Sequence, residues 1–175
     1  MAEILDTSVA PKPEALSVQE LRSLIQYDPE TGTLTWLKKR GKKLPGDVAG
    51  SVNNLGYVQV TVNYQPHLAH RVAYALMIGQ WPPQQIDHIN GNPTDNRWEN
   101  LRPSNQNENA WNQGPQKNNT SGHKGVHWVS ANRNWRAMIG YRGQKISLGN
   151  FSTKEEAADA YARAAKKLHG EFARV

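Results

Sequence analysis

The sequence contains no cysteine, and this absence excludes several kinds of site. Without thiols the chain has no disulfides, no thiolate zinc sites and no cysteine nucleophiles. Any bound metal ion must be held by Asp, Glu, His, Asn or water. Oxygen and nitrogen ligands of this kind suit Mg²⁺ or Mn²⁺ better than a structural zinc ion. The lack of cysteine also fits a reducing cytosol.

Long apolar runs are absent as well. The mean hydropathy is −0.76, and no stretch reaches the roughly 18 consecutive apolar residues of a membrane-spanning helix. The N-terminal segment has neither a basic start nor an apolar run, so we expect no secretory signal and interpret residues 1–16 as a disordered lead. A chain of 175 residues with 37% apolar content suits one or two small compact domains.

Positive charge is concentrated in the last third of the chain. The formal net charge is +6. Residues 1–118 hold eleven Lys and Arg against eleven Asp and Glu, whereas residues 119–175 hold ten against four. The whole excess therefore lies after residue 118. A neutral front part and a basic back part indicate that the back part binds a polyanion.

The front part shows alternating strand and helix patterns, typical of an α+β fold with an antiparallel meander. Ser17 is the predicted N-cap of the first helix, which is followed by a polar turn and two strands. The later order is helix, strand, loop, strand, helix, and the last helix is predicted to be capped by Ser104. In chain order the expected elements are a helix at 18–25, strands at 34–37 and 57–62, a helix at 67–77, strands at 84–89 and 100–102, and a helix to 112.

The back part begins after residues 113–120, an aperiodic stretch that we interpret as a linker. Three strands are expected at 125–129, 135–141 and 145–151. Ser152 with Glu155 has the spacing of a capping box, and apolar residues then recur on one helix face as far as Gly170. The pattern predicts a three-stranded antiparallel sheet packed on one α-helix. The predicted domains are 17–112, with a core at about 84–112, and 121–175.

The segment that carries chemistry begins with Asp87 and His88, at the end of a predicted strand. Hydrolysis of a phosphodiester needs a base to take a proton from water and a cation to stabilise charge on oxygen. A neutral imidazole is available near pH 7, so His88 suits the base. Neighbouring residues of a strand point to opposite sides, so Asp87 joins the same site only if the backbone bends at the strand end.

An amide oxygen from the following helix is the expected partner of Asp87. Asn105, Asn109 and Asn112 stand at i, i+4 and i+7 and therefore share one helix face, from which any of them could complete a metal site. Spacing alone is weak evidence, because ten of the thirty residues 90–119 are Asn.

Three strings carry a family resemblance: Asp-His-Ile-Asn-Gly-Asn at 87–92, Asn-Arg-Trp-Glu-Asn-Leu-Arg at 96–102, and Glu-Asn at 108–109. They resemble the HNH endonuclease superfamily, in the phage homing branch whose last motif residue is Asn. The resemblance implies a ββα-metal fold in which His88 is the general base. It also implies that Asp87 and Asn109 hold one Mg²⁺ or Mn²⁺ ion, and that Asn100 braces the loop and the imidazole.

The last third resembles a second family. Gly125-Val-His-Trp, Trp135-Arg-Ala and Leu148-Gly-Asn-Phe, with the alanine-rich helix, resemble the ethylene-response-factor (APETALA-type) DNA-binding domain over about 121–175. A basic three-stranded sheet of this size can enter the major groove. His127 stands where plant members tend to have Arg, so plant sequence preferences are not transferred. The expected DNA-binding residues are His127, Arg133, Arg136, Arg142 and Lys145.

The resemblances together predict a divalent-metal-dependent homing endonuclease that hydrolyses phosphodiester bonds in duplex DNA at a recognised site. Such a protein is encoded by a phage or bacterium and is cytoplasmic in the host cell. One active site per chain predicts nicking by a monomer, whereas a homodimer would cut both strands. The alternative from a different class is a DNA-binding regulator with a vestigial HNH module. A related nuclease acting on RNA is a third possibility, disfavoured because the sheet resembles readers of duplex DNA.

Overall fold

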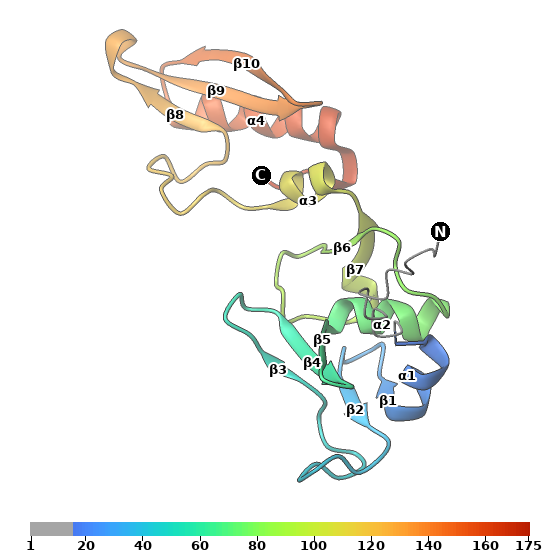
Figure 1. The fold of residues 1–175 in the computed structure, drawn as a ribbon. Helices are drawn as coiled ribbons and strands as arrows, with labels where there is room; N and C mark the ends of the chain where they lie inside the picture. Colours follow the sequence, from blue (N-terminus) through green and yellow to red (C-terminus); the bar gives the residue numbers. More distant parts are fainter. Residues whose placement is uncertain (1–15) are drawn as a thin grey trace, which may run out of the picture. The chain divides into compact units, whose positions relative to one another are not determined.

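The structure, a computed structural model, describes residues 16–175, which form two compact units. One unit ends at Trp81 and the other runs from Pro82 to Val175 (Figure 1). The predicted disordered lead lies outside the described residues except for Leu16, whose carbonyl accepts a hydrogen bond from Trp81 Nε1 at 2.7 Å. None of the described helices is long and apolar enough to span a bilayer.

The first unit packs two helices against small antiparallel sheets. Ser17 caps the first helix as predicted, since its Oγ accepts from the Glu20 amide at 3.1 Å. Leu21, Val60 and Val72 are fully buried in the shared core. The elements are α1 (Val18–Leu24), β1 (Ile25–Tyr27), β2 (Leu34–Trp36), β3 (Ser51–Val52), β4 (Val58–Val62), β5 (Gln65–Leu68) and α2 (Ala69–Ile78), with β1 paired to β2 and the order β3-β4-β5 in the other sheet.

The short strands β1, β3 and β5 were not predicted, and several element ends differ from the prediction by one or two residues. Ile25 begins β1 and pairs with Trp36, so α1 ends one residue earlier than predicted. His67 and Leu68 pair across β4 as part of β5, so α2 begins at Ala69. Pairing with a neighbouring strand satisfies their backbone groups, and helical periodicity in the sequence does not report such pairing. Gly79 ends α2 with a φ of 85°.

The second unit begins with a strand, loop, strand and helix in the predicted order. β6 (Gln85–His88) pairs antiparallel with β7 (Leu101–Ser104), and α3 (Gln106–Asn112) follows directly. Asn100 closes a short 3-10 helix, η1 (Trp98–Asn100), rather than opening the strand. The N-cap of α3 is Asn105 and not Ser104, because Asn105 and Glu108 form a reciprocal capping box while Ser104 is buried at the end of β7.

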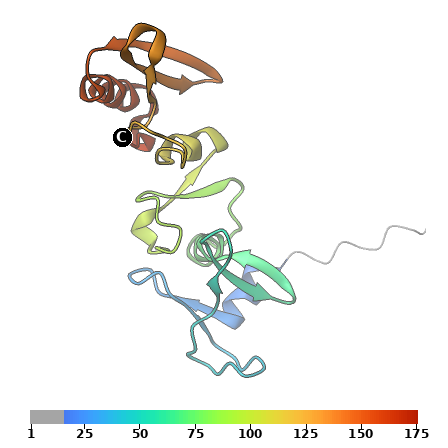
Figure 2. The ribbon, with the colours of Figure 1, turned by 90° about the vertical axis from the view of Figure 1, so that its left-hand side faces the viewer.

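A three-stranded antiparallel sheet and a long helix complete the second unit, as predicted. The strands are β8 (Val126–Val129), β9 (Asn134–Tyr141) and β10 (Gln144–Phe151), in the order β10-β9-β8. Helix α4 (Lys154–His169) covers one face of this sheet (Figures 1 and 2). Ala137 and Ile139 are buried against Ala157, Tyr161 and Ala165, where small side chains allow close approach. The helix cap is Thr153 with Glu156, one residue beyond the predicted pair.

Residues on both sides of the predicted linker pack together. The Trp111 ring stacks on the His169 ring with centroids 4.4 Å apart, and Lys124 Nζ donates to the Trp111 carbonyl at 2.6 Å. A final 3-10 turn, η3 (Gly170–Phe172), lies against α3. Residues 113–120 contain no helix or strand, yet both sides belong to one compact unit. The domain boundaries predicted from the sequence stay predictions.

Gly125 gives a stability prediction with an internal control. Both Gly125 and Gly122 have left-handed backbone, with φ of 71° and 81°. A Cβ on Gly125 would overlap the Met138 carbonyl and the Tyr161 ring, whereas Gly122 has open space. We expect Gly122→Ala to cost roughly 1–2 kcal/mol of backbone strain and Gly125→Ala about 1–3 kcal/mol more from overpacking. Urea unfolding of both variants measures the difference, and equal losses would contradict the close approach.

Candidate active site

The candidate site is built on the paired strands β6 and β7. Asp87 is opposite Arg102 and His88 is opposite Leu101 in the antiparallel register. Both Asp87 and His88 are buried, with exposed fractions of 8% and 6%. The two side chains make separate sets of hydrogen bonds, Asp87 toward α3 and β7 and His88 toward the loop between the strands.

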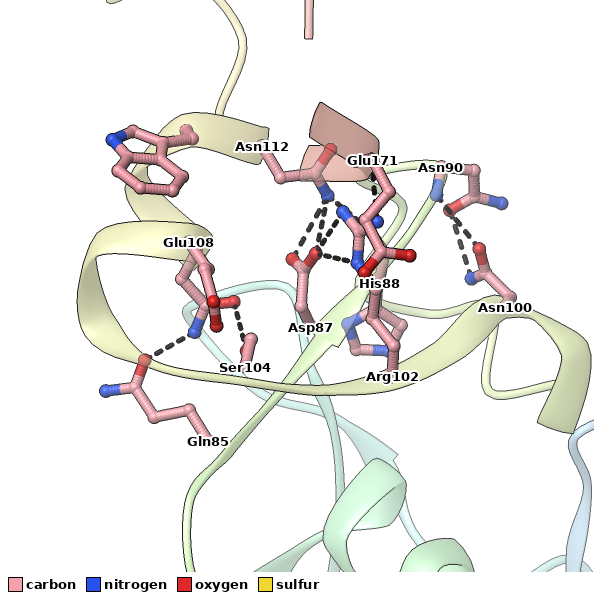
Figure 3. Close-up of polar contacts among 12 residues, drawn as sticks. Gln85, Asp87, His88, Asn90, Asn100, Arg102, Ser104, Glu108, Asn112 and Glu171 are labelled. Atoms are coloured by element: carbon pink, nitrogen blue, oxygen red, sulfur yellow. Dashed lines mark hydrogen bonds and ion pairs between the residues drawn. The ribbon is translucent and has the colours of Figure 1, made fainter. Parts of the chain in front are cut away.

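Asp87 is held by donors from two elements, which converge on it in Figure 3. Arg102 donates from Nε at 2.9 Å and from Nη2 at 2.8 Å, both to Oδ2. Asn112 Nδ2 lies 2.9 Å from Oδ2 and 3.1 Å from Oδ1, and it also donates to the His88 carbonyl at 2.7 Å. These bonds compensate the burial of the carboxylate and attach the end of α3 to the end of β6.

His88 is oriented by Asn96, a residue that the sequence analysis did not single out. His88 Nε2 lies 3.2 Å from Asn96 Oδ1. Because an amide oxygen only accepts, this pairing assigns the proton to Nε2 and the basic lone pair to Nδ1. Burial lowers the pKa of His88 below its ordinary value, and the Asn96 hydrogen bond and the charges of Asp87 and Asp95 oppose this only in part. The imidazole is therefore neutral at pH 7, as a general base requires.

Asn100 braces the loop between β6 and β7. Its Oδ1 accepts from the Asn90 amide at 2.9 Å, and its Nδ2 donates to the Asp95 carbonyl at 2.7 Å and to Asn90 Oδ1 at 3.1 Å. The loop-bracing part of the expected role thus has a structural counterpart, while the hydrogen bond to the imidazole is made by Asn96. In an Asn-rich segment, nothing local distinguishes Asn96 from its neighbours.

The three amides on the common face of α3 have different surroundings. Asn105 is the N-cap. Asn109 accepts from Ser104 Oγ at 2.9 Å and donates to the Gln85 side chain. Asn112 is the amide at Asp87. The structure therefore brings Asp87 together with Asn112, and directs Asn109, the ligand implied by the family resemblance, to the start of β6.

Asp87 offers a carboxylate oxygen to a hard divalent ion, while the groups that the structure directs at it are the N–H donors of Arg102 and Asn112. Across residues 16–175 no cluster of three or more His, Asp or Glu side chains is suited to hold a metal ion, so an ion here would depend on one carboxylate, amide oxygens and water. Within residues 16–175, the one donor to Asp87 Oδ1 is Asn112 Nδ2, which leaves lone pairs for a cation. Carboxylate, amide and water oxygens are the ligands that Mg²⁺ takes.

The five expected DNA-binding residues lie on the sheet of the back part. Cross-strand pairing of Arg136 with His127, and of Gly140 with Lys145, places these side chains on the face opposite α4. Arg136 Nε donates to Asn150 Oδ1 at 3.0 Å across the sheet. Arg133 and Arg142 stand at the two turns that flank β9, with φ of 47° and 50°. The face is exposed or half-buried throughout and carries no acidic residue.

Comparison with known proteins matches the segment that contains Asp87 and His88. The family described as HNH endonuclease matches residues 67–111. Protein 3.8 of Escherichia phage T7 is 39% identical over 89 residues, which cover 51% of this chain and 73% of that protein. An uncharacterized HNH endonuclease of Acanthamoeba polyphaga mimivirus is 37% identical over 106 residues, covering 59% and 54%. No solved structure matches. The family match ends at residue 111, so the resemblance of 121–175 to ethylene-response-factor domains stays a prediction.

Proposed function

Because the chain belongs to the HNH endonuclease family, we propose that it is a divalent-metal-dependent DNA endonuclease of the homing type. The observation that carries this proposal is the neutral, oriented imidazole of His88 at the end of β6, one residue after the buried carboxylate of Asp87. A base for water and a carboxylate for a cation are the two groups that phosphodiester hydrolysis needs.

His88 acts as the general base in this proposal. Its Nδ1 carries the basic lone pair and takes a proton from the attacking water. Asn96 keeps the tautomer and the ring orientation through the Nε2 hydrogen bond, so it is a positioning residue. Asn100 holds the loop that carries Asn96, because it joins Asn90 to the Asp95 carbonyl.

Asp87 and an amide of α3 hold the divalent ion, Mg²⁺ or Mn²⁺. The ion stabilises negative charge on the phosphate oxygens when it is bound. The family resemblance assigns the amide to Asn109, whereas Asn112 is the α3 amide in contact with Asp87, through its Nδ2 donor. Asn112 would hold the ion only with its Oδ1 turned toward Asp87. In either arrangement Asn112, in the last turn of α3, fixes the orientation of the Asp87 carboxylate.

Duplex DNA is the proposed substrate, bound by the exposed face of the sheet formed by β8, β9 and β10. Arg136 lies in the middle strand, between His127 and Asn150. A twisted basic sheet with arginines at its turns can follow the major groove and its flanking phosphates. One active site per chain gives nicking by a monomer and double-strand cleavage by a dimer.

A DNA-binding regulator with an inactive module is the second candidate function. It is favoured by the hydrogen bonds that both Asp87 oxygens accept from protein donors, as they would in a purely structural carboxylate. In that case the protein would bind DNA without cutting it.

His88→Ala separates the two candidates. With Mg²⁺ or Mn²⁺, the unaltered protein should convert supercoiled plasmid or phage DNA to open circles, and the variant should be slower by at least about 100-fold, because the general base is lost. Agarose gels measure the conversion. His123→Ala, outside the site, is the control. Tight binding of DNA containing the target site, with no conversion by the unaltered protein, would support the regulator instead.

The choice between Asn109 and Asn112 is tested by direct Mn²⁺ binding. We expect Asn112→Ala to weaken Mn²⁺ binding by about tenfold or more, because ligands and the residues that orient them contribute on this scale. The free-ion signal in electron paramagnetic resonance measures the bound fraction. Asn107→Ala, an exposed amide on the same helix, is the matched control. A loss confined to Asn109→Ala would assign the ligand to Asn109.

Arg136→Ala tests the sheet face. We expect weaker binding of duplex DNA and a plot of log affinity against log salt that is shallower by about 0.9, the value of one phosphate contact. Fluorescence anisotropy with a labelled duplex at several salt concentrations measures both quantities. Arg163→Ala, exposed on α4, removes the same charge from the other side of the sheet as a control. Equal slopes for the two variants would show that the face is misassigned.

A further inference from the structure

Arg102 is the one charged side chain in direct contact with Asp87 among residues 16–175. Its side chain is 11% exposed, and its guanidinium has partners on three sides. Nε and Nη2 donate to Asp87 Oδ2, and Nη1 donates to the Glu171 carbonyl at 2.8 Å. The Phe172 ring lies under the guanidinium, 3.7 Å from ring centroid to Cζ. The proposed metal carboxylate therefore already has a fixed cationic partner.

This cation is permanent and well held. An arginine guanidinium stays protonated at every physiological pH, and a bidentate contact with a stacked aromatic ring fixes its position. Because Glu171 and Phe172 belong to η3, the position of the charge is set by the C-terminal end of the chain. A segment after α4 thus determines the electrostatics beside Asp87.

Asp87 and Asp95 are each paired with an arginine before an ion binds, and Arg97 is shared with the exposed Glu99. Asp87 is balanced by Arg102 and Asp95 is balanced by Arg97, whose Nη2 lies 2.8 Å from Asp95 Oδ2. A divalent ion arriving at Asp87 is attracted by one carboxylate and repelled by the guanidinium beside it. A phosphodiester of DNA supplies the missing negative charge for both cations.

We propose that Arg102 keeps the divalent ion weakly bound in the DNA-free protein, so that the ion is retained chiefly together with the DNA phosphate. This inference rests on the proposed endonuclease function and gives Arg102 a role that the family resemblance does not assign. Arg102 is a positioning residue in this role, because it acts through Asp87 and the bound ion.

Direct Mn²⁺ binding to the DNA-free protein tests the inference, because repulsion and structural support predict opposite signs. Arg102→Gln removes the charge and keeps a donor for Asp87, so it should tighten Mn²⁺ binding by about tenfold, whereas Arg102→Lys, which retains the charge, should bind like the unaltered protein. Arg163→Gln is the control for net charge. If Arg102 only holds Asp87 in place, Arg102→Gln binds Mn²⁺ more weakly. Unchanged or weaker binding by Arg102→Gln overturns the inference.

A second measurement tests the dependence on DNA. In a His88→Ala background, chosen because its cutting is expected to be slow, Mn²⁺ should strengthen binding of a labelled short duplex in fluorescence anisotropy, since the ion and the phosphate stabilise each other. If Mn²⁺ has no effect on duplex binding, the inference that the ion and the DNA phosphate are retained together is wrong.

Failure of the inference is distinct from failure of the proposed function. If the unaltered protein nicks DNA and Arg102→Gln does not gain Mn²⁺ affinity, only the inference falls.

Discussion

The buried carboxylate of Asp87 is the constraint on which the second unit depends. A charged group with 8% exposure is tolerated only when it is paired and hydrogen-bonded. Arg102 supplies the opposite charge from β7, and Asn112 supplies a donor from the last turn of α3. Satisfying one carboxylate therefore fixes the register of β6 against β7, the position of α3, and, through the Glu171 carbonyl, the end of the chain. Replacing any partner would leave a buried charge with too few donors.

The loop between β6 and β7 solves a related problem with neutral groups. It must hold an imidazole in one orientation and satisfy the hydrogen bonds of its own backbone. Asparagine carries both a donor and an acceptor on one short side chain, so Asn90, Asn96 and Asn100 bridge backbone and side chain with no net charge. The abundance of Asn in this segment thus has a physical reason, although it makes the individual roles hard to separate by sequence.

Local patterns predicted the order of the helices and of the strands from β6 onward, but not the short strands β1, β3 and β5. The alternation of β9 placed Ala137 and Ile139 on the buried face. Caps were misplaced by one residue at α3 and α4, because neighbouring Ser, Thr and Asn residues are all good caps. The contact of Asp87 with Asn112 depends on strand register and on the rotation of α3 about its axis. Neither is encoded locally, and the stacking of Trp111 on His169 likewise joins residues far apart in sequence.

The distribution of charge connects the site to the sheet. Within residues 84–112, two Arg stand against four Asp and Glu, so this segment has no electrostatic attraction for DNA of its own. The excess of positive charge lies after residue 118, and the exposed sheet face carries Arg136 and Lys145. In the proposed function, affinity for DNA therefore comes mainly from the back part. Because the positive charge lies on the sheet, the proposed metal site itself carries little charge. Binding of the metal ion at this site then depends on the DNA phosphate that the sheet holds near it.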